Sequence, residues 1–260
     1  MGSVKAEVLR EPHCARQIYD QHCHTKYELL FVLNGSIRLN LEGEQLLLGE
    51  NSGIVIEPMK YHVVTGNNTP YHRLILSFGQ EAVPEPIADA FRERVRRYRR
   101  IGGSEAVSAL RRYAEIVELA EPLYAPLAEA LLTQAIYDLT FEKSVASGAS
   151  EASGSDKIRQ ITAFVEENLH RELPLSDIAA GLYMSESSLC HLFREEMNIS
   201  LKQYILQKKM TYARVLLKKG TSPGAVASMC GYHSYASFYK IFVKITGKTP
   251  GQIVAEPPQR

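Results

Sequence analysis

The sequence lacks any long apolar segment and contains little cysteine. No run approaches the ~20 consecutive apolar residues that a membrane-spanning helix needs, and the first residues lack the apolar core of a secretion signal. Cys14, Cys23, Cys190 and Cys230 are scattered and form no CxxC pair, so neither a disulfide framework nor a zinc knuckle is indicated. We therefore expect a cytoplasmic protein without a membrane partner.

Charge of one sign is not in excess either, because the formal net charge of the whole chain is +1. Its distribution is uneven, however. Residues 155–260 contain 14 Lys and Arg against 9 Asp and Glu, whereas residues 1–154 contain 16 against 20. A chain of 260 residues, 45% of them hydrophobic, is long enough for two domains that each bury a core. A basic second domain behind an acidic first one suggests a polyanion as its partner.

The first part of the chain, from about residue 18 to 78, has the pattern of short β-strands. Ile37, Leu39 and Leu41 alternate with polar residues, which is the period of a half-buried strand. Glu42–Glu44 is a turn signal that leads into a return strand. Several short strands at this spacing predict a sandwich or barrel.

Helical patterns replace the strands after the prolines at positions 84 and 86. We predict helices over roughly 87–100, 104–119 and 122–142, the last with one apolar face. Residues 144–155 are rich in Ser, Gly and Ala, which is typical of a flexible interdomain linker. The predicted class is therefore α+β. Its parts are a β-barrel over 1–84, a helical and dimerising segment over 85–143, the linker at 144–155 and an all-α domain over 156–260.

The C-terminal region contains a duplicated unit. Residues 185–193 reappear 49 residues later as residues 234–242, with a serine and apolar residues at the same positions. In each copy the serine is placed to cap a helix whose apolar residues share one face. A short predicted helix precedes each copy, at 175–181 and 223–230, and a long amphipathic helix at 201–219 joins the copies. Two such helix-turn-helix pairs on one rigid helix would place two recognition helices about one DNA turn, roughly 34 Å, apart.

The helix faces opposite the predicted core define the candidate DNA-contacting residues. They are Ser187, Cys190, His191 and Arg194 in the first copy, and Tyr235, Ala236, Ser237, Tyr239 and Lys240 in or beside the second. We expect His191 and Lys240, which occupy equivalent positions, to reach base edges or nearby phosphates. Gly231 suits a turn with positive φ, whereas Tyr183 at the matching place needs a different turn or bears strain. The alternative is a plain helical bundle with accidental similarity.

Residues 155–254 resemble the DNA-binding domain of the AraC/XylS family of bacterial transcription regulators. The resemblance is carried by Leu175–Ala179, Ser185–Phe193, Tyr204–Ile205, Lys209–Met210, Val226–Ala227, Gly231–Tyr232 and Gly247–Pro250. Ile253 and Val254 stand where the family has an aromatic residue and an arginine. Lys209 replaces a common arginine, and a lysine cannot form the bidentate contact that an arginine makes. The resemblance implies sequence-specific binding to double-stranded DNA, a small-molecule effector, a homodimer and, for an activator, RNA polymerase as a further partner.

The front of the chain, over about residues 15–80, resembles a cupin barrel, the usual sensory domain of this family. The motif residues are His22, His24, Glu28, Gly35, Pro58 and His62. The resemblance implies that His22, His24, Glu28 and His62 line the effector pocket, and in metal-binding cupins such groups ligate one ion. His22 and His24 share a strand face, and three imidazoles with a carboxylate suit Zn, Fe, Mn or Ni. A divalent transition metal is thus the one candidate cofactor. The alternative is a pocket without metal, favoured by Lys60 in the place of a motif glycine.

Two other classes of function compete with a ligand-responsive regulator. A metal-dependent cupin enzyme leaves the duplicated unit without a role, and a constitutive architectural DNA-binding protein leaves the pocket without one. We therefore predict a transcriptional regulator and not an enzyme. Salt-dependent, sequence-specific DNA binding would separate it from the enzyme, and a response of that binding to a small molecule would separate it from the architectural protein.

Overall fold

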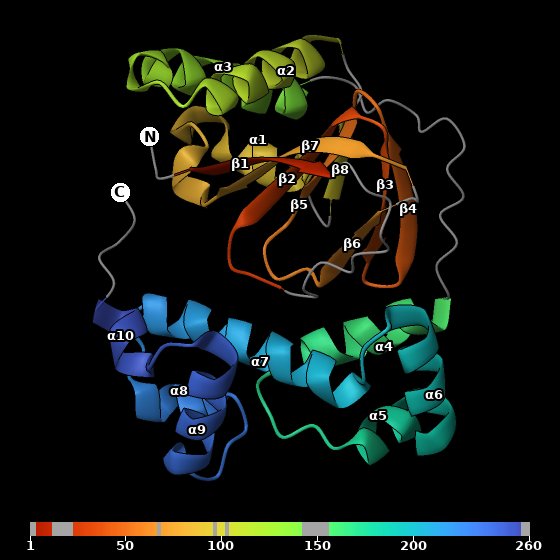
Figure 1. Cartoon of the computed structure of the whole chain (residues 1–260). Coiled ribbons are helices and arrows are strands. Elements are labelled where there is room, and N and C mark those ends of the chain that lie inside the picture. The colour runs from red at the N-terminus through yellow and green to blue at the C-terminus, as the bar shows by residue number, and fades with distance from the viewer. Residues whose placement is uncertain are drawn as a thin grey trace.

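The computed structural model describes residues 4–11, 23–66, 69–95, 98–101, 104–141 and 156–255. The predictions for Cys14, His22 and the linker at 144–155 therefore lie outside the described residues. In the described part the chain is arranged in three layers. Two helices, α2 and α3, lie on one side of a pair of β-sheets, and the helices of the C-terminal region lie on the other side (Figure 1).

The N-terminal half is built from antiparallel strands. Their bounds are β1 Lys5–Glu11, β2 Tyr27–Asn34, β3 Ser36–Leu41, β4 Glu44–Gly49, β5 Ser52–Ile56, β6 His62–Gly66, β7 Tyr71–Phe78 and β8 Tyr98–Ile101. They form two sheets, in the orders β1-β7-β2-β5-β8 and β4-β3-β6, and their pairings are antiparallel. The predicted turn between β3 and β4 is confirmed. Glu42 and Gly43 have φ angles of 50° and 86°, as a two-residue hairpin turn requires.

Strands β1 and β8 differ from the sequence prediction. β1 precedes residue 18, where strands were expected to begin. The predicted helix over 87–100 ends at Arg94 as α1 (Ala88–Arg94), and the chain then returns to the sheet as β8. β8 pairs with β5 from Gly53 to Ile56. This pairing satisfies backbone N–H and C=O groups that β5 would otherwise expose at the sheet edge, which overrides the helical preference of a short segment.

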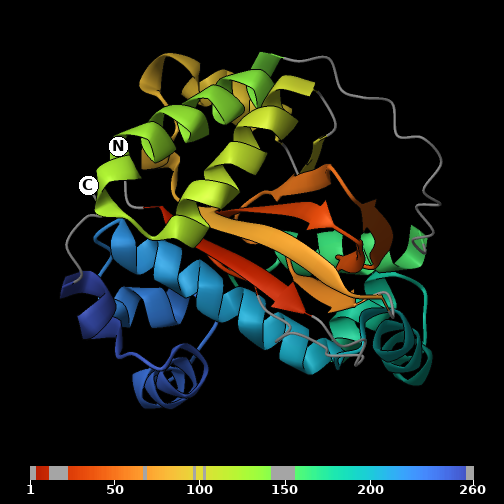
Figure 2. The same ribbon diagram turned by 45° about the horizontal axis from the view of Figure 1, so that its top comes forward.

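Strand β2 shows how the alternation of side chains divides the core. Leu29 and Phe31 pack with the helices that cover the larger sheet, whereas Leu30 and Val32 pack between the two sheets. The covering helices are α1, α2 (Ser104–Leu119) and α3 (Ala125–Phe141), and Figure 2 shows α2 and α3 crossing over the strands. The N-terminal half is therefore an antiparallel β-sheet domain with a helical region on one face, which we call the sheet domain.

Residues 156–255 form the helical domain. Its helices are α4 Asp156–Glu167, α5 Leu175–Gly181, α6 Glu186–Met197, α7 Leu201–Lys218, α8 Pro223–Met229, α9 Tyr235–Thr246 and α10 Pro250–Ala255. Helices α5 and α6 form one pair, α8 and α9 form another, and α7 runs between the pairs (Figure 1). The predicted helix caps are confirmed, because the Ser185 and Ser234 side chains accept hydrogen bonds from the backbone N–H groups of Ser188 and Ser237.

Each helix pair has its own hydrophobic core. Leu189 and Phe193 of α6 are buried in one core, and Phe238 and Phe242 of α9 are buried in the other. Both cores continue along α7, which is therefore shared between the two pairs. Among the residues that the structure describes, no helix combines the length and the hydropathy that crossing a membrane demands.

Candidate functional site

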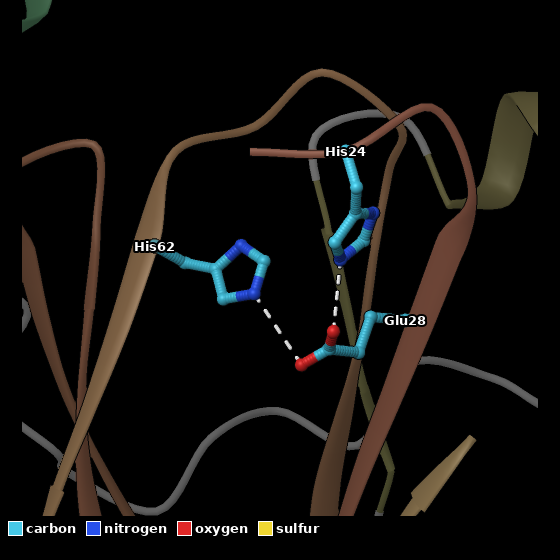
Figure 3. A group of neighbouring side chains, drawn as sticks. All are labelled: His24, Glu28 and His62. Carbon is cyan, nitrogen blue, oxygen red and sulfur yellow. Dashed lines mark hydrogen bonds and ion pairs between the residues drawn. The ribbon is translucent and has the colours of Figure 1, made fainter. Parts of the chain in front are cut away.

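The structure brings together three of the four predicted pocket residues (Figure 3). His24 precedes β2, Glu28 lies on β2 and His62 begins β6. The Glu28 carboxylate lies between the two rings, with Oε2 at 2.8 Å from His24 Nε2 and Oε1 at 3.3 Å from His62 Nε2. We call these residues the pocket triad; the fourth predicted residue, His22, lies outside the described residues.

Backbone carbonyl groups fix the protons of both rings in the pocket triad. His24 Nδ1 lies 2.8 Å from the Lys26 carbonyl oxygen, and His62 Nδ1 lies 3.0 Å from that of Lys60. A carbonyl oxygen only accepts, so both Nδ1 atoms donate. In a neutral imidazole the Nε2 atom then presents a lone pair, and here it faces a carboxylate oxygen, which is another acceptor. A proton between the two atoms, a bound cation or a donor group of a ligand would each complete this arrangement.

The donor set fits a divalent transition metal. The ligand atoms that these three residues offer all lie within 4.8 Å of one another, and adjacent ligands on an ion with bonds of about 2.1 Å are roughly 3.0–3.4 Å apart. Metal-bound histidines commonly donate their second N–H to a carbonyl or carboxylate group, which orients the ring. Two imidazoles and one carboxylate are ligands that suit zinc, iron, manganese or nickel.

The pocket triad borders a cavity of about 450 Å³ inside the sheet domain. This volume falls in the range of small-molecule sites. Besides the pocket triad, the cavity is lined by Lys5 and Glu7 of β1, by Arg73 of β7 and by apolar side chains. Arg73 is almost fully buried, and its guanidinium group lies over the Tyr71 ring at 5.6 Å from the ring centroid. Polar and charged residues outnumber apolar ones in this lining, so the cavity can select and orient a polar ligand.

The predicted DNA-contacting residues lie on the outer faces of α6 and α9. Eight of the nine are exposed and Cys190 is half-buried. His191 forms an ion pair with Glu195 on the same helix, at 3.2 Å. The Tyr235 and Tyr239 rings lie 6.0 Å apart, one turn from each other along α9. Both helices therefore present polar and aromatic groups away from their cores.

The turns before α6 and α9 are more alike than the sequence indicated. Gly231 has a φ of 76°, and Tyr183, at the matching position, has a φ of 54° with its side chain almost wholly in solvent. Tyr183 therefore keeps the same left-handed turn and bears its strain.

Lys209, which replaces a family arginine, donates to the carbonyl oxygens of Arg171 and Cys230 at 2.5 and 2.8 Å. Its role in the structure is thus to join α7 to the turns of the helical domain.

A buried ionic network that no sequence pattern indicated lies between the sheet domain and the helical domain. Lys208 of α7 is fully buried, and its Nζ atom donates to Glu42 Oε1 at 2.5 Å, to Glu166 Oε1 at 2.6 Å and to the Met59 carbonyl oxygen at 2.6 Å. Lys60 also donates to both carboxylate oxygens of Glu166, at 3.0 and 3.1 Å. Lys208 lies on the face of α7 that carries the buried residues Leu201, Tyr204 and Ile205, but this spacing does not reveal which carboxylates pair with it.

Burial and charge pull the pKa values in this network in opposite directions. Burial alone would lower the pKa of Lys208, but Glu42 and Glu166 raise it above its ordinary value. Burial alone would raise the pKa of Glu166, but Lys208 and Lys60 hold it below its ordinary value. The Tyr204 hydroxyl group donates to Glu42 at 3.2 Å, and burial raises its pKa well above the usual value. The Lys208 ammonium group and the Glu166 carboxylate are therefore both ionised at neutral pH.

Apolar and backbone contacts complete this docking interface, which consists of the β3–β4 and β5–β6 turns packed on α4, α6 and α7. The Tyr61 and Tyr204 rings pack edge to face at 5.4 Å. The Asn40 side chain donates to the Glu196 carbonyl oxygen, in the last turn of α6, at 2.8 Å. At Gly43 a Cβ atom would lie 2.4 Å from the Ile158 side chain of α4. The sheet domain is thus seated closely on the helical domain.

Comparisons with known proteins agree with both halves of this architecture. Residues 5–136 match the family model described as the AraC-like ligand binding domain, and residues 178–256 match the one described as a helix-turn-helix domain. The Msm operon regulatory protein of Streptococcus mutans is 28% identical over 147 residues, which are 54% of this chain and 53% of that protein. The probable transcriptional regulator LumQ of Photobacterium leiognathi is 28% identical over 91 residues, 35% of this chain and 37% of that protein.

Among solved structures, ToxT from Vibrio cholerae, crystallised with (E)-4-(8-methylnaphthalen-1-yl)but-3-enoic acid, is 13% identical and aligns over 97% of this chain and 98% of its own, with a TM-score of 0.44. The matches to these curated relatives span about half of their length or less. The model of the AraC-like ligand binding domain alone extends over half of the sequence. The chain therefore belongs to the AraC family of transcriptional regulators.

Proposed function

We propose that this protein is a sequence-specific DNA-binding regulator whose sheet domain, a cupin-type barrel, binds a small-molecule effector. The observation that carries the proposal is the equivalence of α6 and α9. Each follows a shorter helix through a left-handed turn, begins at a serine cap and keeps its outer face exposed. Two equivalent helices held by one continuous helix are suited to two successive major grooves on one side of a duplex.

Selection of bound DNA from a random pool, followed by substitution, tests the DNA-binding function. His191→Ala and Lys240→Ala should each weaken binding by about 1–3 kcal/mol if they contact base edges, and each should relax specificity at one position of the selected site. Lys219→Ala, at an exposed residue beyond the end of α7, is the matched control and should change neither. Unchanged affinity and specificity in both variants would contradict the proposed orientation of the two helices.

For the sheet domain, we propose that the pocket triad, together with His22, binds the effector or a divalent transition metal that the effector contacts. The charged groups converge on one cavity, and acceptor atoms face each other within it. A bound divalent ion would accept lone pairs from both Nε2 atoms and from the Glu28 carboxylate. Elemental analysis of wild-type protein purified without added metal or a histidine tag should find a transition metal. The Glu28→Ala variant should lack this metal, whereas the control variant Glu50→Ala, changed at an exposed position, should retain it. Metal-free wild-type protein would leave the pocket triad as direct contacts of the effector.

We further propose that α3 forms the interface of a homodimer. Leu127, Ala130, Gln134, Tyr137 and Phe141 are all exposed, and their alternating spacing of three and four residues places them in one stripe along the helix. Leu119 and Leu123 extend this exposed apolar surface beyond the helix start. A repeat of 3.5 residues is the pattern by which two helices pack side by side. A second copy of the same helix is therefore the partner that fits.

A further inference from the structure

Both segments that carry histidines of the pocket triad also contact α7. His24 follows Cys23, whose Sγ atom lies 3.0 Å from the Thr211 hydroxyl oxygen. That hydroxyl group donates to the Gln207 carbonyl oxygen at 2.9 Å and lies 3.4 Å from the Cys23 carbonyl oxygen. His62 follows the turn Met59–Tyr61, where the Met59 carbonyl oxygen accepts from Lys208. The Met59 N–H group also donates to the His24 carbonyl oxygen at 2.8 Å. The two segments are therefore joined to each other and to the same turn of one helix.

The turn Met59–Tyr61 has contacts in two directions. Toward the pocket, the Lys60 carbonyl oxygen lies 3.0 Å from His62 Nδ1. Toward the helical domain, the Lys60 ammonium group bonds to Glu166. The Tyr61 N–H group donates at 3.0 Å to Glu42 Oε1, the sheet-domain atom that accepts from Lys208. Met59 has a φ of 71°, a conformation that is unfavourable for a residue with a side chain and persists only where surrounding contacts maintain it. Contacts to α7 and α4 are among those that do so.

We propose that Lys208 and Thr211 of α7 are positioning residues for the pocket triad, so that occupancy of the pocket and docking of the sheet domain on the helical domain favour each other. This inference rests on the proposed function and names the regulation of its effector site. When the sheet domain separates from α7, the Met59 carbonyl group and Glu42 lose their buried cation, and the two histidine-bearing segments lose their common support. Linkage requires the reverse effect to be equally large, because the coupling free energy is a property of both sites together.

Titration of the full chain with Zn²⁺, followed by calorimetry, tests the forward direction. Lys208→Met should weaken zinc binding about 10-fold, within the range usual for coupled sites. Lys202→Met, the same substitution at an exposed position of the same helix, should bind zinc like the wild type. Glu166→Gln provides a milder variant, because its side chain is partly exposed on α4 and does not reach the cavity. It should also weaken zinc binding, by a smaller factor.

Amide hydrogen exchange tests the reverse direction and separates positioning from general destabilisation. Zinc should slow exchange in α7 of the wild type but not in Lys208→Met. Without zinc, His62→Gln should accelerate exchange in α7, whereas Thr65→Ala, on the same strand but outside the cavity, should not. Equal zinc affinity in the wild type, Lys208→Met and Glu166→Gln would overturn the coupling, as would unchanged exchange in His62→Gln. If the wild type binds no zinc while His62→Gln still accelerates exchange, the metal proposal fails and the coupling stands.

Discussion

The Lys208 ammonium group has three oxygen acceptors within 2.6 Å, and the titration of Lys208 and Glu166 sets the pH range in which the docking interface is stable. The pKa of Lys208 is raised on folding, so its contribution to stability is complete below its usual pKa and is lost as the pH rises through the raised value. The pKa of Glu166 is lowered, so its contribution is complete above its usual value of 4.5 and is lost as the pH falls below it. The interface is therefore most stable across the neutral range.

Glu166→Gln should remove the acid-sensitive part of this stability. We expect the variant to unfold at a lower urea concentration than the wild type at neutral pH, because Lys208 and Lys60 lose a charged partner. The difference should shrink as the pH falls below 4.5, since the wild-type carboxyl group then becomes neutral as well. Urea midpoints of both proteins across this range provide the measurement. A difference that is the same at neutral and acidic pH would rule out this role of the carboxylate.

Gly231 and Tyr183 provide a matched pair of predictions about backbone strain. A Cβ atom at Gly231 would lie 2.2 Å from backbone atoms of Arg171 and Glu172, and its φ is positive. Gly231→Ala should therefore lower the free energy of unfolding by about 2 kcal/mol or more. Tyr183→Gly should raise it by ~0.5–1 kcal/mol, because the exposed tyrosine ring loses little and the left-handed strain is relieved. Urea unfolding of both variants checks the opposite signs; a stabilised Gly231→Ala or a destabilised Tyr183→Gly would show that the two turns are not equivalent.

At the level of whole elements, the stability of helices in the helical domain depends on the side chains that cap their first turns. Ser234 accepts from the Ser237 N–H group at the start of α9, so Ser234→Ala should lower the free energy of unfolding by about 1 kcal/mol, and Ser234→Asp should retain most of it. Ser228→Ala, on the exposed side of α8, is the control and should have a smaller effect. Thermal unfolding of the three variants would show whether the cap matters, and equal losses in Ser234→Ala and Ser234→Asp would argue against it.

The sequence predicted those elements whose signals are local. Serine caps and apolar spacing locate α6, α7 and α9, and a turn dipeptide locates the β3–β4 hairpin. Strand β8 could not be predicted in this way, because it exists to pair with β5, and that partner is brought to it only by the complete fold. The same holds for β1, which is defined by its pairing with β7. Long-range pairing leaves little trace in the residues that pair.

The candidate site was predictable only in part, for a related reason. His24, Glu28 and His62 could be assigned to one pocket because a motif resemblance points to it. The expected strand face for His24 is wrong, because His24 precedes β2. Lys208 gave no such indication, since its burial depends on Glu42 and Glu166 from distant parts of the chain. A buried lysine becomes favourable only when paired carboxylates offset the loss of hydration. The docking interface was therefore outside the reach of sequence patterns.

For the whole molecule, the exposed stripe on α3 predicts the oligomeric state. Leu127→Glu should convert a dimer to a monomer, because a charge replaces an apolar group in the middle of the proposed interface. Arg112→Glu, an exposed position on the neighbouring helix α2, changes charge outside the stripe and should leave the dimer intact. Sedimentation velocity of both variants and the wild type distinguishes these outcomes. A monomeric wild type would contradict the proposed dimer, and a dimeric Leu127→Glu would mean that another surface is used.

The docking interface joins two parts of one polypeptide. Its occupancy is therefore set by the effective concentration of the linked surfaces and not by the concentration of the protein. Segments linked in one chain meet at an effective concentration that is in the millimolar range for short flexible connections. A contact that two separate molecules would rarely form is then occupied most of the time. It also follows that a several-fold change in its intrinsic strength, of the size proposed for pocket occupancy, is enough to shift the balance between docked and released molecules. A modest contact within one chain is therefore well suited to respond to a ligand.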